Sequence, residues 1–213
     1  MEDNLSWHRC DMSGLLLARD ELLWREAKPY LDVRNNDEHT LVAYGVAQAL
    51  LREIPEADES VVLPAVLLHD VGWKRVPKDL LLDAIGRNPK RPDLVRDHEL
   101  YGVEIAREIL EHHRPEGVNI EAVLAIIDGH DTTRVARSIN DAVMKDADKC
   151  WRTTPHGMRI IRAWYDWSLE EYIDMVSTVS NPRLLTAPGR AMAETFTASL
   201  RAEVALKNYM EIE

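Results

Sequence analysis

Apolar residues recur at three- and four-residue intervals along almost the whole chain, which is the spacing of amphipathic helices. Ser13, Asn35, Ser60 and Asn119 precede such segments and are residue types that cap helix N-termini. Prolines and glycines separate the segments. The predicted helices cover residues 15–24, 36–53, 61–71, 78–85, 92–113, 120–127, 140–151, 158–167, 168–179 and 189–209.

Two local details accompany these helices. Asn35 and Glu38 have the spacing of a capping box, which predicts a helix start that places His39 in the first turn. Pro64 is expected in the first turn of the helix that Ser60 caps, and Gly72 is expected to end that helix.

No segment has the period-2 alternation of a strand, and the chain has neither an internal repeat nor a linker-like stretch. We therefore predict an all-α fold, a compact multi-helix bundle in which residues 1–213 form a single domain.

Composition narrows the class of protein. A hydrophobic content of 46% with 30% charged residues is typical of a globular chain, and a net charge of −11 argues against nucleic acid or an anionic membrane surface as a partner. Cys10 and Cys150 are far apart and form no CxxC motif, so reduced thiols are expected, although a structural disulfide stays an alternative. With an acidic N-terminus and no apolar stretch of about 20 residues, the sequence predicts a cytoplasmic protein and leaves homo-oligomerisation open.

A histidine and an aspartate, His69 and Asp70, stand side by side at the end of the apolar run 61–68. A buried carboxylate costs several kcal/mol unless its charge is compensated. A divalent metal ion is the most direct compensation, because it accepts both imidazole and carboxylate ligands. Alone, the pair is weak evidence for a metal site.

Further ligand types lie on the inward faces or at the ends of other predicted helices: His39, His98, His130 and Asp148. Successive members of the set, counted through the His69–Asp70 pair, are separated by 30, 28, 32 and 18 residues. Each gap holds about one helix and a loop, so each helix can deliver its ligand to one place. A lone inward histidine is usually a core residue, whereas the full set indicates a metal centre.

These residues resemble the HD-domain superfamily of metal-dependent phosphohydrolases. Its signature is a histidine, an adjacent His-Asp pair and a distant aspartate on an all-helical core. Here the signature positions are filled by His39, His69, Asp70 and Asp148. The resemblance covers about residues 30–152 and leaves residues 156–213 as a C-terminal helical extension.

Superfamily members with two additional histidines before the last aspartate look like binuclear enzymes, and His98 and His130 fill those positions. The resemblance therefore implies two divalent transition-metal ions. Iron, manganese, zinc, cobalt and nickel all suit imidazole with carboxylate. By analogy, His39, His69 and Asp148 hold one ion, His98 and His130 hold the other, and Asp70 bridges them.

Asp146 competes with Asp148 for the last ligand position, and helical periodicity does not decide between them. The superfamily usually takes the aspartate of an Ala-Asp dipeptide, which here is Ala147-Asp148. We therefore expect Asp148 to be the ligand.

The substrate is less well defined. Many members continue His-Asp-Ile-Gly-Lys, whereas Trp73 intervenes here and Lys74 comes one residue late. The acidic residues of the alarmone hydrolases and 5′-deoxynucleotidases and the Gly-Tyr-Pro motif of the cyclic-dinucleotide enzymes are absent. Arg34 and Lys74 are the preferred candidates for binding phosphate, ahead of Arg75 and Arg134. Asp131 is expected either to orient a ligand imidazole or to cap the next turn.

The sequence thus predicts a phosphohydrolase that cleaves a phosphomonoester or phosphodiester of a small, nucleotide-like substrate. A metal-activated water at a two-metal centre would do so, with His69 and Asp70 as catalytic residues. One alternative is a mixed-valent di-iron oxygenase on the same ligands, which oxygen uptake without phosphate release would favour. Another is a non-catalytic nucleotide-binding regulatory module, which would bind nucleotide without metal or turnover.

Overall fold

Helices form over most of the predicted segments. The computed structural model describes residues 14–85 and 89–210, and within these residues all regular structure is helical. The α-helices are α1 (Ala18–Ala27), α2 (Asn36–Glu53), α3 (Glu59–Leu68), α4 (Leu81–Ala84), α5 (Asp93–His113), α6 (Ile120–Ile127), α7 (Ile139–Trp151), α8 (Pro155–Tyr165), α9 (Leu169–Met175) and α10 (Ala187–Met210). The short 3-10 segments are η1 (Lys28–Tyr30), η2 (Val71–Arg75), η3 (Lys78–Leu80) and η5 (Asn181–Arg183), and η4 (Val176–Ser180) is a π-helical turn.

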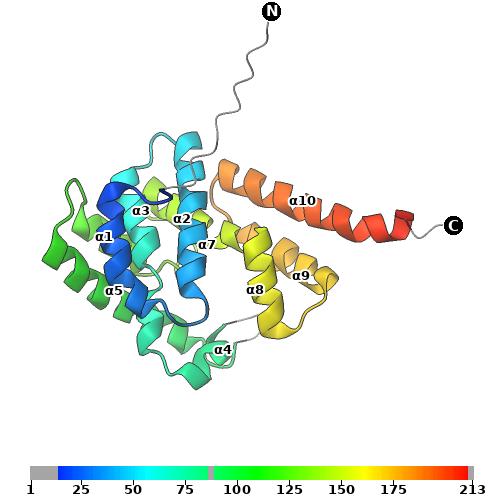
Figure 1. Cartoon of the computed structure of the whole chain (residues 1–213), viewed down its shortest axis with the longest axis horizontal. Coiled ribbons are helices and arrows are strands. Elements are labelled where there is room, and N and C mark those ends of the chain that lie inside the picture. The colour runs from blue at the N-terminus through cyan, green and yellow to red at the C-terminus, as the bar shows by residue number, and fades with distance from the viewer. Residues whose placement is uncertain (1–13, 86–88, 211–213) are drawn as a thin grey trace, which may run out of the picture.

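The short helix α3 lies at the centre of the bundle. All of its residues from Val61 to Leu68 are buried, because the helix is apolar around its whole circumference. It packs against α1, α2, α6 and α7, while α5 packs against α6 and η2 (Figure 1). The prediction of a compact all-α fold is confirmed for the described residues.

The C-terminal helices pack on one side of this bundle. Helix α10 contacts α2, α7 and α9, and its C-terminal half extends away from the other helices (Figure 1). The predicted helix over 168–179 ends earlier, because the chain passes from α9 into the π-helical turn η4.

Several of the predicted helix starts differ from the structure, including those of α4, α8 and α10 by two or three residues. Asp58, and not Ser60, is the N-cap of α3, and its carboxylate accepts the backbone N–H of Ser60. The capping box before α2 is wrong, because Asn35 has a left-handed backbone with φ of 57° and makes no side-chain cap bond. The first helix begins three residues later than predicted, after Leu17. Asn119 does cap α6 as predicted.

Residues outside the described ranges carry some of the predictions. These residues include Ser13, Cys10 and the acidic N-terminus. The predicted helix cap at Ser13, the predicted thiol at Cys10 and the inference drawn from the N-terminus therefore concern residues outside the described ranges. Cys150 is a buried free thiol. Across the described residues, no helix combines the length and the hydropathy required to cross a membrane.

Pro64 and Gly72 have different roles from those expected. Pro64 lies in the interior of α3, where it removes one backbone donor, and not in the first turn. The helix ends at Leu68, and Gly72 lies inside η2. A Cβ atom at Gly72 would come within 1.9 Å of the His98 carbonyl oxygen, so glycine is required by the close approach of η2 to α5.

Replacing Gly72 by alanine should therefore lower the free energy of unfolding by about 3 kcal/mol, since backbone atoms of α5 would have to move. Gly45→Ala in α2 is the control, because a Cβ atom there would make only an ordinary contact at 3.6 Å. It should raise the free energy of unfolding by about 0.5–1 kcal/mol, since alanine favours a helix more than glycine does. Urea unfolding of both variants checks the pair. Equal stability of Gly72→Ala and wild type would contradict the close approach.

Candidate metal centre

Two histidines are placed by the same local arrangement, immediately after the end of a helix. His69 follows α3, and its Nδ1 donates to the carbonyl of Val66 at 2.7 Å. His130 follows α6, and its Nδ1 donates to the carbonyl of Ile127 at 2.9 Å. Because Nδ1 of each ring donates to a carbonyl, Nε2 of both rings points into the centre, where a cation would take the place of any proton on that nitrogen.

The first set of side chains comes from α2, α7 and the end of α3, and is here named the His39 group. Nε2 of His39 lies 3.1 Å from Nε2 of His69. Oδ1 of Asp148 lies 3.4 Å from the His39 nitrogen and 3.9 Å from that of His69. Oδ2 of Asp70 lies 3.5 Å from each of the two nitrogens. All four side chains are buried.

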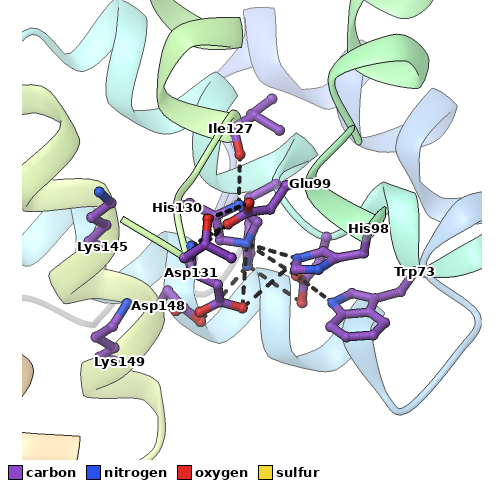
Figure 2. A network of polar contacts seen from close by, with 12 residues as sticks. Trp73, His98, Glu99, Ile127, His130, Asp131, Lys145, Asp148 and Lys149 are labelled. Carbon is purple, nitrogen blue, oxygen red and sulfur yellow. Dashed lines mark hydrogen bonds and ion pairs between the residues drawn. The ribbon is translucent and has the colours of Figure 1, made fainter. Parts of the chain in front are cut away.

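The second set comes from α5 and the loop after α6, and is named the His98 group. Nε2 of His98 lies 3.2 Å from Nε2 of His130. Oδ1 of Asp70, the other oxygen of that carboxylate, lies 3.7 Å from both. Oδ2 of Asp131 is 3.9 Å from His98 and 3.8 Å from His130, and the convergence of these side chains is visible in Figure 2.

The donors of both groups are spaced as ligands around a divalent ion. Bonds of about 2.0–2.2 Å to nitrogen and oxygen place neighbouring ligands roughly 3–4 Å apart. Lone pairs and carboxylate oxygens that face one another at these separations repel unless a proton or cation lies between them. Three overlapping groups could hold a metal ion: His39, His69 and Asp148; His69, Asp70 and His130; and His98, His130 and Asp131.

The electrostatics of the cluster agree with binding a cation. Burial lowers the pKa of His69 and lowers that of His98 to about 4, so both rings stay neutral. Burial alone would also lower the pKa of His130, but Asp70 and Asp131 raise it to about 9. Burial opposes ionisation of Asp70, yet the surrounding imidazoles hold the pKa of its carboxyl well below the usual range. The carboxylates therefore create a negative field in which a metal ion would be stabilised.

The structure brings together all six residues that the sequence proposed as ligands. It also separates the two competing aspartates. Asp148 faces His39, whereas the carboxylate of Asp146 accepts the backbone N–H groups of Leu185 and Thr186 at 2.7 and 2.8 Å. The Thr186 hydroxyl donates to the same carboxylate at 2.7 Å. Asp146 on α7 thus holds the residues just before α10 through hydrogen bonds.

The two candidate phosphate-binding residues behave differently. Burial lowers the pKa of Arg34 while the charges of Asp70 and Asp131 act to raise it, and its guanidinium lies over the Trp73 ring at 4.6 Å. Its Nε and Nη1 are buried and have no hydrogen-bond partner among the described residues. The amine of Lys74 pairs with Asp32 on the surface instead. The proposed role for Lys74 therefore has no support from its position.

Several residues of the site were missed or only partly recognised. Asp131 contributes an oxygen directly to the His98 group and does not orient a ring through hydrogen bonding. Lys149 and Arg152 face Oδ2 of Asp148 at 3.5 and 3.8 Å. Arg152 lies one helical turn after Asp148, which is a signal that spacing could have given.

Glu99, next to His98, was not predicted to contribute to the site. Its buried carboxylate accepts the backbone N–H groups of Asp131 and Thr132, each at 2.8 Å, and the Thr132 hydroxyl at 2.7 Å. It therefore fixes the loop that carries His130 and Asp131 onto α5 (Figure 2).

Asparagine substitution should separate the roles of the two aspartates on α7. Asp148→Asn removes a charge from the His39 group and should lose bound metal while keeping the fold. Asp146→Asn weakens the bonds to Leu185 and Thr186 and should lower the free energy of unfolding by about 1–3 kcal/mol while keeping the metal. Elemental analysis and thermal unfolding check both outcomes. The reverse pattern would assign the ligand to Asp146.

Comparison with known proteins is consistent with this geometry. The family model of the HD domain matches residues 36–153, which is more than half of the chain and includes all six clustered ligand candidates as well as Asp131. No curated protein and no solved structure matches the chain. The family indicates a metal-dependent hydrolase type of function, and the clustered histidines and aspartates agree with it. The chain belongs to the HD domain family.

Proposed function

We propose that the protein is a metal-dependent phosphohydrolase whose centre holds two divalent transition-metal ions. Its substrate is a small phosphomonoester or phosphodiester, most simply a nucleotide. The His39 group would hold one ion and the His98 group the other. Imidazole and carboxylate donors suit iron, manganese, zinc, cobalt or nickel.

The observation that carries this proposal is the division of the Asp70 carboxylate between the two groups. Oδ2 lies 3.5 Å from His39 and His69, and Oδ1 lies 3.7 Å from His98 and His130. A carboxylate that bound a single ion, or that made only a structural hydrogen bond, would not need a pair of imidazoles near each of its oxygens. A carboxylate that bridged two ions would need such a pair on both oxygens.

Divalent ions bound in this way supply a water that is nucleophilic at neutral pH and offset negative charge on phosphoryl oxygens. The protein contributes the orientation of the donors. The Nδ1 bonds of His69 and His130 to main-chain carbonyls hold both Nε2 lone pairs toward the centre. Lys149 and Arg152 compensate the outer oxygen of Asp148, so its inner oxygen keeps a fixed direction.

Arg34 supports an anionic substrate. A guanidinium with two buried, unpartnered nitrogens beside a carboxylate-rich centre is suited to bind phosphate oxygens. The net charge of −11 disfavours nucleic acid and anionic membranes, which leaves a small phosphorylated molecule as the preferred partner.

The first experiment is elemental analysis of the purified protein, followed by phosphatase and nucleotide substrates tested with each metal. Release of phosphate or of a nucleoside monophosphate that depends on metal is the expected result. Oxygen uptake with an organic substrate and no phosphate release would overturn the proposal in favour of an oxygenase.

Asp70→Ala should abolish both metal content and phosphohydrolase turnover, because both groups lose an oxygen ligand at once. Elemental analysis and phosphate release measure the two effects. Asp79→Ala, which alters an exposed aspartate, is the matched control and should resemble wild type. Full turnover by Asp70→Ala would rule out the centre as the site of catalysis.

Arg34→Ala should lower kcat/KM by about 10–100-fold, mainly through KM, since charge-assisted hydrogen bonds to the substrate would be lost. Arg34→Lys keeps the charge without the forked geometry and should recover part of this loss. The exposed Arg25→Ala is the control. Steady-state kinetics at saturating metal decide the matter, and unchanged kinetics for Arg34→Ala would remove this residue from the substrate site.

A further inference from the structure

Trp73 makes polar and aromatic contacts inside the candidate centre, although the tryptophan departs from the sequence pattern of the superfamily. Its indole Nε1 donates to Oδ1 of Asp70 at 3.1 Å. Its ring stacks on His98, with centroids 4.0 Å apart and planes inclined by 12°. The side chain is only 2% exposed, and Figure 2 shows it lying beside His98 with the indole nitrogen toward the cluster.

The same indole also contacts Arg34, the candidate residue for binding the substrate phosphate. The guanidinium carbon of Arg34 lies 4.6 Å from the centroid of Trp73 and 5.3 Å from that of Trp164 on α8. Arg34 and Trp164 both fall outside the segment that the HD domain family model matches. Trp73 therefore connects the shared metal-binding segment to residues that flank it.

The histidines of the cluster are oriented in two different ways. His69 and His130 are fixed by Nδ1 bonds to carbonyl oxygens, whereas Nδ1 of His39 and of His98 has no partner among the described residues. On the Nδ1 side, packing takes the place of such a bond for those two rings. His39 packs edge-on against Trp151 at 4.5 Å, and His98 stacks on Trp73.

From this geometry we propose that Trp73 is a positioning residue for the His98 group and for Arg34. Its N–H uses one lone pair of Asp70 Oδ1, which leaves the other directed at His98 and His130. One face of the indole fixes the His98 ring, and the ring system also supports the Arg34 guanidinium through a cation–π contact. The indole thereby fixes the position of the His98 group, which would hold the second metal ion, relative to Arg34, which would bind the phosphate. This inference rests on the proposed two-metal function.

If Trp73 only filled space in the core, it would not need the hydrogen bond to Asp70 or the stacking on His98. Trp73 also packs with a small apolar cluster that includes Val33, Val76 and Leu94. Packing against that cluster needs a large apolar ring but neither an indole N–H nor a parallel imidazole. Phenylalanine would keep the packing and the aromatic surface under Arg34 while removing the hydrogen bond, so it separates the two roles.

Trp73→Phe should bind the first equivalent of Zn²⁺ or Mn²⁺ as wild type does and the second about 10–100-fold more weakly, because an outer hydrogen bond to a ligand is lost. Isothermal titration measures both equivalents. At saturating metal, kcat should fall while KM stays within about twofold, since the ring under Arg34 persists. Trp73→Leu, which lacks that ring, should raise KM as well.

The control is Trp24→Phe on α1, a half-buried tryptophan that packs against the main core. It should leave metal affinity and kinetics unchanged. Tight binding of both equivalents by Trp73→Phe would overturn the inference and leave the two-metal proposal standing. A wild-type protein that binds no divalent metal, or only one equivalent, would overturn the proposed function itself.

A measurement on the wild-type chain covers the case in which a Trp73 variant does not fold. With 5-fluorotryptophan incorporated, the ¹⁹F resonance of Trp73 should shift as the second equivalent of Zn²⁺ is added, while that of Trp24 should stay unchanged. A Trp73 resonance insensitive to the second equivalent would contradict its contact with that position.

Discussion

The dominant physical constraint in this molecule is the charge of two carboxylates, Asp70 and Asp148, buried among four imidazoles. An isolated buried carboxylate costs several kcal/mol, so the fold must provide compensation. Lys149 and Arg152 face the outer oxygen of Asp148 and supply part of it. The inner oxygens face imidazole nitrogens, and a divalent cation between these donors would compensate the remaining negative charge. The helices are arranged around this requirement.

Four of the six ligand candidates lie at helix ends: His39 in the first turn of α2, His69 and Asp70 just after α3, and His130 just after α6. At such positions the backbone carbonyls of the last helical turn are free to accept hydrogen bonds. His69 and His130 use them through Nδ1, which orients the rings without any additional side chain. His39 and His98 lie within helices and have no such carbonyl partner, and a tryptophan packs against each ring instead.

The family segment and its flanks contribute different chemistry. Among residues 14–85 and 89–210, all clustered metal-ligand candidates fall within the segment 36–153. Arg34 precedes it and Trp164 follows it, and the Arg34 guanidinium lies against the rings of both Trp73 and Trp164. If the metal ions supply the hydrolytic chemistry, these flanking residues are suited to decide which anionic substrate is accepted.

The sequence by itself determined the all-α class and most helix ranges, because helical periodicity is a local property, and it indicated the six ligand candidates through their residue types and the resemblance to the HD-domain signature. The tertiary structure alone decided the rest. The contacts of Asp131 and Trp73 with the cluster, and the surface pairing of Lys74 with Asp32, arise between elements that are distant in sequence. Asp146 and Asp148 lie on the same helix and helical periodicity does not separate them; the resemblance favoured Asp148, and the two carboxylates have different partners, on α2 and near α10. Periodicity shows that a side chain faces inward, but which inward partner it meets depends on how the helices pack.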